Sequence, residues 1–209
     1  MNGRRSSGWA YAAVATNLNA AVVMIGVLAR GLPAGESSLT TRMEYVRAHA
    51  TVWRLGWVTW HVAAIALLAL FVVLSRLWSE RAPIVVRLAL ICATAGLAAD
   101  LAAQTMLMAV SPRAGHDDFR LIESIAVPLS GYLGNGLYTV GGALLTWAGR
   151  RDLPRALLGL GAAVWASGFA LSAAALIGSE RGQVVGGSIL ILLFIAWSAL
   201  VGRWLGRRE

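Results

Sequence analysis

Six long apolar runs, separated by short polar segments, make up most of the chain. They lie near residues 8–30, 53–78, 84–110, 121–149, 154–178 and 182–205. Each run is long enough to cross about 30 Å of hydrocarbon at about 1.5 Å of helix rise per residue. Pro83 and Pro154 stand at the beginning of the third and fifth runs, where a missing N–H costs least. The pattern predicts an all-α integral membrane protein, a bundle of six transmembrane helices forming one domain over residues 1–209.

The composition supports this class. Apolar residues make up 58% of the chain and charged residues only 13%, whereas soluble domains carry about 25% charge. The predicted surroundings are therefore membrane lipids. All 18 basic residues are arginines, and they stand in small groups between the apolar runs. Binding to nucleic acid needs basic residues gathered on one face, so nucleic acid is not an expected partner.

The arginines also predict an orientation. Six spans place both termini on one side of the membrane, together with the loops 79–83 and 150–153. The arginines on that side are Arg4, Arg5, Arg76, Arg81, Arg87, Arg150, Arg151, Arg155, Arg203, Arg207 and Arg208, and those on the other side are Arg30, Arg42, Arg47, Arg54, Arg113, Arg120 and Arg181. Eleven against seven favours cytoplasmic termini. Because Arg-only, Ala-rich usage is typical of a GC-rich bacterial genome, we expect the bacterial cytoplasmic membrane.

The longest outer connection, residues 31–52, carries a helical pattern of its own. Its apolar residues recur at i, i+3, i+7 and i+10, namely at Met43, Val46, Ala50 and Trp53, and charged residues lie between them. This spacing predicts a short amphipathic helix at the outer interface between the first two spans, beginning after Ser37 or Ser38 and running into the second span. Such a helix either covers a pocket or rests on lipid headgroups.

Four spans carry a polar side chain at a similar depth. Asp100, the only acid near the middle of a span, lies about 15 Å from the outer end of its helix, and Gln104 follows one turn later on the same face. The same arithmetic gives depths of about 12 Å for His61, 16 Å for Asn19 and 18 Å for Tyr132. An acid at mid-membrane costs about 2.5–3.5 kcal/mol on insertion scales, so it usually faces protein or water. These residues predict a polar site in the outer leaflet.

The fourth span is polar on two sides. One helical face carries Pro128, Tyr132, Asn135 and Thr139, and another carries Glu123, Ser130 and Gly134. A helix that is polar on two sides cannot turn either of them to lipid, so we expect this span to be central. Pro128 removes one backbone hydrogen bond and predicts a kink.

The candidate site residues follow from this layer. If the protein is an enzyme, Asp100 is the predicted acid or base, with His61 or Tyr132 as its partner. The predicted ligand-binding residues are Asn19, Trp57, Trp60, Gln104, Glu123, Tyr132 and Asn135. Packing alternatives stay open, because the amides could form interhelical hydrogen bonds, His61 could donate to a backbone carbonyl, and the tryptophans could be core residues.

Metal chemistry has little support. His61 is the only intramembrane histidine, so one chain cannot supply two histidines to a haem. A zinc ion needs three or four ligands, and the run His116-Asp117-Asp118 is predicted to lie in a short solvated loop, where neighbouring side chains diverge. No metal is predicted, and the sequence identifies no cofactor.

Three functions remain open. The first is a non-enzymatic membrane protein that binds or passes a small, largely apolar ligand through the outer-leaflet pocket. The second is an enzyme acting on a lipid or isoprenoid through Asp100 and His61. The third is an accessory subunit of a larger membrane complex, in which the polar residues only pack helices. The sequence leaves open whether the chain forms homo-oligomers.

Overall fold

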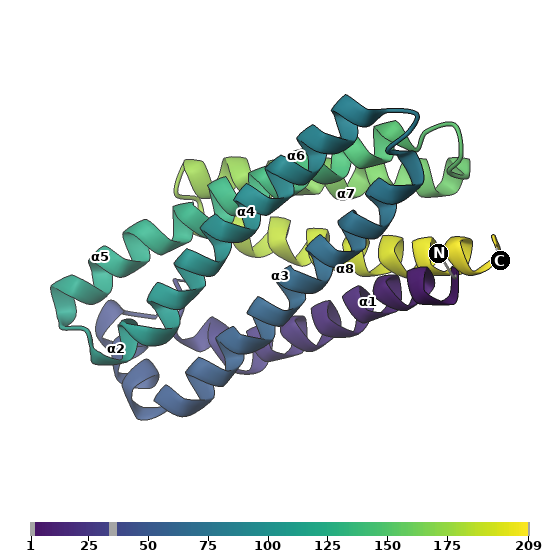
Figure 1. The fold of residues 1–209 in the computed structure, drawn as a ribbon. Helices are drawn as coiled ribbons and strands as arrows, with labels where there is room; N and C mark the ends of the chain where they lie inside the picture. The colour runs from purple at the N-terminus through teal and green to yellow at the C-terminus, as the bar shows by residue number, and fades with distance from the viewer. Residues whose placement is uncertain (1–2, 34–36, 209) are drawn as a thin grey trace.

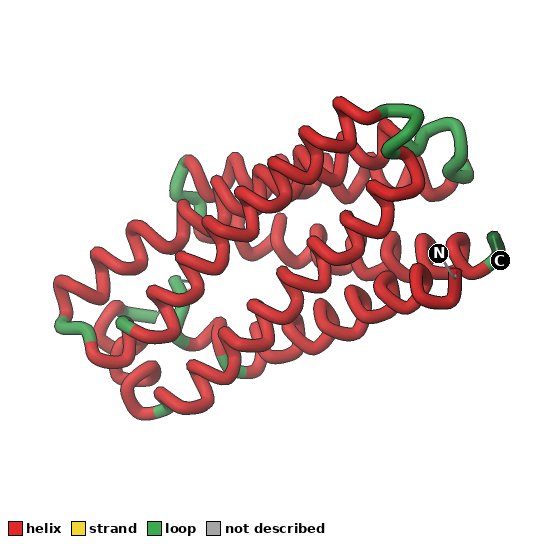
Figure 2. The backbone as a smooth tube through the Cα atoms, viewed as in Figure 1, coloured by secondary structure: helices red, strands yellow, loops and turns green. Residues whose placement is uncertain are grey.

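The computed structural model describes residues 3–33 and 37–208, and every regular element in this part is helical (Figure 2). The elements are α1 (Gly3–Gly26), η1 (Leu28–Arg30), α2 (Leu39–Ala48), α3 (Ala50–Trp78), α4 (Pro83–Ala109), η2 (Ser111–Arg113), α5 (His116–Val127), η3 (Pro128–Gly134), α6 (Asn135–Ala148), α7 (Arg155–Leu176) and α8 (Glu180–Gly206). Residues 34–36 of the predicted outer connection lie outside the described residues. The predicted all-α class is confirmed.

Five stretches are long and apolar enough to cross a membrane. They are Ser6–Arg30, Ala50–Trp78, Pro83–Arg113, Arg155–Leu176 and Glu180–Gly206. They coincide with five of the six predicted spans, which supports an α-helical membrane bundle. The remaining prediction, 121–149, is divided between α5, η3 and α6. The run His116-Asp117-Asp118 was wrongly predicted as a loop: it forms the first turn of α5, where acidic side chains complement the helix dipole.

The long helices form a closed ring (Figure 1). α1 packs against α3, α3 against α4, α4 against α6, α6 against α7 and α7 against α8, and α8 returns to α1. Both chain ends lie at one end of the ring, here called the terminal end. α2 and the beginning of α5 lie at the opposite end, here called the distal end. The helix formed by η3 and α6 packs between α4 and α7 as one member of the ring, and Tyr132 on one of its polar faces is 43% exposed, so the predicted central place was wrong.

Glycines bring the backbones of α4 and α6 into contact. A Cβ atom on Gly96 would lie 2.8 Å from the carbonyl oxygen of Gly134, and one on Gly141 would lie 2.8 Å from that of Ala89. A backbone atom cannot move aside as a flexible side chain can. The close approach of these two helices therefore depends on small residues, as in many membrane bundles.

The core is divided into two apolar clusters along the bundle axis. The terminal cluster includes Leu70, Phe71, Leu74, Trp78, Leu145, Trp165, Trp197 and Val201. The distal cluster contains Leu28, Met43, Val46, Trp53, Trp57, Ala103, Leu107, Ala114, Phe119, Ile122 and Ala126. The two clusters share no residue. The helix segments that lie between them are therefore available for buried polar side chains.

A salt bridge joins two connections at the terminal end. The Trp78 indole and the Arg81 guanidinium both donate to Oδ2 of Asp152, at 3.0 and 2.8 Å. The hydrogen bond from Arg81 holds the pKa of the Asp152 carboxyl below its usual range. Through this carboxylate, the α3–α4 connection is fixed to the α6–α7 connection.

A short helix, α2, lies in the connection for which the interfacial amphipathic helix was predicted. It begins after Ser38, whose hydroxyl accepts a hydrogen bond from the Thr41 amide at 3.2 Å, as an N-cap does. Met43 and Val46 are buried in the distal cluster, so this apolar face packs on the protein. The prediction that α2 runs on into the second span was wrong, because His49 (φ −115°, ψ 29°) separates it from α3.

Candidate functional site

A layer of polar side chains lies between the two apolar clusters. On α4, Asp100 stands between Ala93 of the terminal cluster and Ala103 of the distal cluster. On α3, His61 stands between Ala66 and Trp57 in the same way. The structure thus places Asp100 and His61 at one level of the bundle. We define the polar layer as Asp100, His61, Gln104, Ser130 and Tyr138.

The Asp100 carboxyl is at the centre of this layer. The side chain is only 8% exposed, and its Oδ1 accepts a hydrogen bond from the Ser130 hydroxyl at 2.5 Å. The Gln104 amide and the Tyr138 hydroxyl also interact with this carboxyl, as does the His61 ring electrostatically. Four elements, α3, α4, η3 and α6, therefore contribute to one site.

The π-helix η3 shapes the wall that faces Asp100. It begins at Pro128, which has no N–H to donate, so the predicted irregularity takes the form of a seven-residue π-helix. Ser130 of this segment reaches the carboxyl, and a Cβ on Gly134 would lie 3.2 Å from the Cβ of Asp100. Glycine at this position lets the backbone of η3 lie directly against the acid. Short π-helical segments are frequent at functional sites.

The ring of His61 is oriented by the backbone of its own helix. Its Nδ1 lies 2.9 Å from the carbonyl oxygen of Trp57, and since a carbonyl only accepts, Nδ1 carries the proton. Its Nε2 lies 3.4 Å from the Thr105 hydroxyl. Both ring nitrogens thus have hydrogen-bond partners other than Asp100 in the described structure.

Several buried polar atoms on α3 and α4 lack a hydrogen-bond partner in the described residues. They are Oε1 of Gln104, whose amide interacts with Asp100, and Nε1 of Trp57 and of Trp60, which lie in or against the distal cluster. Gln104 is only 2% exposed, so water cannot reach its oxygen from the surface. Buried polar groups are nearly always paired. This part of the bundle thus holds hydrogen-bonding capacity that the protein itself does not use.

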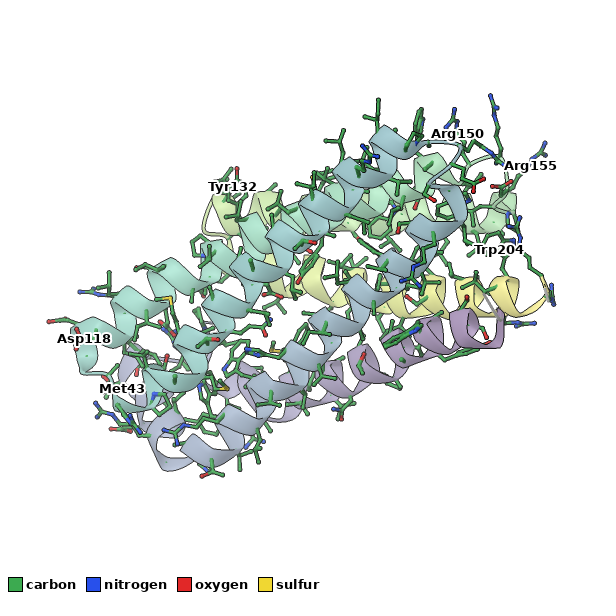
Figure 3. All side chains as sticks on the ribbon, in the orientation of Figure 1. Met43, Asp118, Tyr132, Arg150, Arg155 and Trp204 are labelled. Carbon is green, nitrogen blue, oxygen red and sulfur yellow. The ribbon has the colours of Figure 1, made fainter. Side chains whose placement is uncertain are left out.

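Two predicted residues lie outside the layer. Asn19 is exposed on α1, and Asn17 is the buried amide, which donates to the Ala13 carbonyl at 2.8 Å. Tyr132 is 43% exposed and points away from the bundle (Figure 3). Tyr138 takes the place beside Asp100 that the helical spacing assigned to Tyr132. The prediction that Asn19 and Tyr132 converge with Asp100 was wrong, because depth along a helix does not fix the side that a residue faces.

Asn135 joins α6 to α7. Its amide nitrogen donates to the Gly168 carbonyl at 2.8 Å and to the Ser172 hydroxyl at 2.9 Å. The Ser172 hydroxyl donates in turn to the Gly131 carbonyl at 3.3 Å. These contacts match the helix-packing alternative for Asn135, and they lie on the side of α6 that faces α7.

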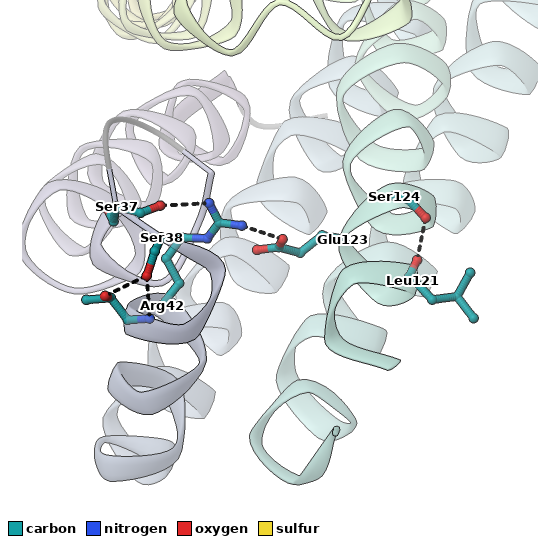
Figure 4. A network of polar contacts seen from close by, with 7 residues as sticks. Ser37, Ser38, Arg42, Leu121, Glu123 and Ser124 are labelled. Carbon is teal, nitrogen blue, oxygen red and sulfur yellow. Dashed lines mark hydrogen bonds and ion pairs between the residues drawn. The ribbon is translucent and has the colours of Figure 1, made fainter. Parts of the chain in front are cut away.

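Glu123 belongs to a separate network at the distal end (Figure 4). Its Oε2 accepts from Nη2 of Arg42 at 2.7 Å, and the two side chains are only 9% and 10% exposed. Arg42 also donates to the Ser37 carbonyl at 3.4 Å. The sequence suggested Glu123 as a ligand contact, but this carboxylate already binds α2 to α5. Sequence reasoning missed Arg42, because its partner lies 81 positions away in the chain.

Two hollows, each of about 420 Å³, open elsewhere on the surface. One lies between α1 and α3 near Trp9 and Ile65, and the other lies at the distal end near Arg113 and Leu121. Neither is lined by Asp100 or its partners, and the Asp100 and Gln104 side chains are buried from the surface. Among the described residues, no three His, Cys, Asp or Glu side chains come together as metal ligands.

Comparisons with protein-family models, curated proteins and solved structures give no match to this chain.

Proposed function

We propose that this chain is a six-span protein of the bacterial cytoplasmic membrane that binds or passes a small, largely apolar ligand through the polar layer. Support for a sixth crossing comes from the ring. α4 ends at the distal end and α7 begins at the terminal end, and the helix formed by η3 and α6 packs between them. The chain between α4 and α7 therefore traverses the same thickness as its neighbours.

Cysteine labelling tests the proposed topology. In a Cys92→Ser background, Thr40→Cys should react with a membrane-impermeant maleimide added to intact cells. Arg151→Cys should react only after the membrane is opened. Both positions are exposed at opposite ends of the bundle, so accessibility reports the side of the membrane and not burial. If only Arg151→Cys were labelled in intact cells, the orientation would be the opposite of the one proposed.

The observation that carries the binding proposal is the unused hydrogen-bonding capacity beside Asp100. Gln104 offers an acceptor beside Asp100, and Trp57 offers a donor in the distal cluster. A ligand with one polar group and an apolar body would satisfy these atoms and place its body against the distal cluster. Ligand sites are commonly apolar, with a few such convergent polar groups.

Access to the layer would come from the distal end. α2 covers the distal cluster, and the Arg42–Glu123 ion pair fixes it to α5. The buried layer then corresponds to the state in which α2 is in place, and movement of α2 would admit a ligand from the outer leaflet. His61 hydrogen-bonds to the Trp57 carbonyl and Asp100 to the Ser130 hydroxyl, and not to each other. These contacts favour the binding role over an acid–base pair formed by the two residues.

Photolabelling tests the proposal. Decanol carrying an alkyl diazirine should label residues around positions 57–61, 100–104 and 130–138 in the reconstituted protein, and excess decanol should suppress this labelling. Ile91 and Leu192 are exposed on outer faces and supply the background of lipid-facing positions. Labelling confined to such positions would contradict the binding role and leave the layer as helix packing, as the accessory-subunit alternative predicts.

A further inference from the structure

A hollow of about 420 Å³ opens on the surface between α1 and α3, and it is here called the α1–α3 hollow. From α1 it is lined by Trp9, which is 48% exposed. From α3 it is lined by side chains that share one helical face, among them Ile65, Leu68, Ala69, Val72 and Arg76. Of the described residues that line the hollow, only Arg76 is charged, and the others offer apolar surface.

The length of this α3 face matches one leaflet of a membrane. α3 is long and apolar enough to cross a bilayer, and its axis rises by about 17 Å from Ile65 to Arg76. Half of a hydrocarbon core of about 30 Å has nearly the same thickness. Because α3 ends at Trp78, Arg76 lies at the membrane surface and Ile65 lies toward the bilayer centre. The hollow therefore has the depth and polarity that one acyl chain and its headgroup require.

The terminal end, where Arg76 lies, carries an excess of positive charge. The acids that the structure describes there are Glu80 and Asp152, and Asp152 is already paired with Arg81. Figure 3 labels two of the arginines at this end, Arg150 and Arg155. The exposed arginines at this end include Arg76, Arg81, Arg87, Arg150, Arg151, Arg155, Arg203, Arg207 and Arg208. Such a surface attracts lipids with net negative charge and disfavours the positive group of a zwitterionic headgroup.

We propose that the α1–α3 hollow binds an anionic phospholipid, with one acyl chain against the α3 face and the headgroup phosphate at Arg76. The guanidinium presents several N–H donors to phosphate oxygens, and Trp9 provides an indole of the kind that lies at membrane interfaces. This inference rests on the membrane placement proposed above but does not depend on ligand binding in the polar layer. In the proposed orientation, the lipid belongs to the cytoplasmic leaflet.

Native mass spectrometry of the full-length protein in detergent solution tests the lipid class. Dioleoylphosphatidylglycerol is the anionic probe, and dioleoylphosphatidylcholine, with the same acyl chains, is the zwitterionic one. In separate titrations, the first phosphatidylglycerol should bind at least fivefold more tightly than the first phosphatidylcholine. This comparison uses the unaltered protein, so it does not depend on how any variant folds.

Substitutions of Arg76 test the position of the headgroup. Arg76→Gln should weaken binding of phosphatidylglycerol at least fivefold and bring the two lipids to within twofold of each other. Arg76→Lys keeps the charge and should retain the preference. Arg87→Gln is the matched control, because Arg87 is exposed on α4 at the same end and does not line the hollow. It removes the same charge and should change the affinity less than twofold.

A bulky substitution tests the position of the acyl chain. Ala69 lies between Ile65 and Arg76 in the lining, so Ala69→Phe places a ring where the chain would lie. It should weaken binding of phosphatidylglycerol at least threefold although Arg76 is kept. Val62→Phe adds a ring at a position of α3 that is 48% exposed and outside the lining, so it should have no effect.

Three outcomes would overturn the proposal. Equal affinity of the unaltered protein for both lipids would remove the anionic assignment. Equal losses in Arg76→Gln and Arg87→Gln would show that only the overall charge attracts the lipid. Unchanged binding in Ala69→Phe would place the acyl chain outside the hollow. The membrane placement is tested separately by the cysteine labelling, so it can stand if lipid binding fails.

Discussion

Glu123→Leu is expected to lower the free energy of unfolding by about 3–5 kcal/mol, the typical penalty for breaking a buried ion pair from one side. The substitution leaves the Arg42 guanidinium in a site where its side chain is only 10% exposed. The remaining contact with the Ser37 carbonyl, at 3.4 Å, is too weak to replace a carboxylate. Titration with SDS in mixed micelles measures the change in unfolding free energy.

A double variant isolates the charge. Arg42→Met combined with Glu123→Leu removes both partners, so it should recover most of the lost stability. Glu44→Leu, at an exposed acid on α2, is the matched control and should change stability little. Equal losses in the single and double variants would show that the ion pair does not hold α2 to α5.

Gly96→Ala should lower the unfolding free energy by about 2 kcal/mol, within the usual range for overpacking a well-packed contact. The new methyl group would lie 2.8 Å from the carbonyl oxygen of Gly134, a backbone atom in the π-helix. Relief requires α4 to move away from η3, so the variant should also weaken the contact between Asp100 and Ser130. The same SDS titration measures the loss of stability.

Gly159→Ala is the comparison. Nothing lies within 4 Å of a Cβ at that position of α7, so the methyl group meets open space. Alanine is favoured over glycine in helices by about 1 kcal/mol, so this variant should be neutral or slightly more stable. If both alanine variants behaved alike, the close approach of α4 and η3 would not depend on glycine at position 96.

The membrane class was predictable because it depends on local properties. Apolar run length identified five long helices to within a few residues, and Ser38 marked where α2 begins. The apolar spacing of Met43 and Val46 identified the buried face of that helix. Each of these features is set by neighbours within one or two turns, which a single sequence contains.

The candidate site was only partly predictable, because it depends on which sides of different helices meet. Asp100 and Gln104 share a face of one helix, and the structure buries both. The partner Ser130 lies within a π-helix and Tyr138 lies beyond it, so uniform helical spacing selected Tyr132 instead. The pairing of Arg42 with Glu123 was inaccessible for the same reason, since it depends on how α2 docks on α5.

The π-helix also separates the angular phases of the two helices that it joins. In an uninterrupted α-helix each residue advances the side-chain direction by about 100°, so the faces of α5 would dictate those of α6. A π-helical turn takes more residues than an α-helical turn, and η3 therefore resets this phase. α5 can direct Glu123 toward α2 while α6 directs Asn135 toward α7. The continuous helix formed by α5, η3 and α6 can thus direct its two halves toward different neighbouring helices.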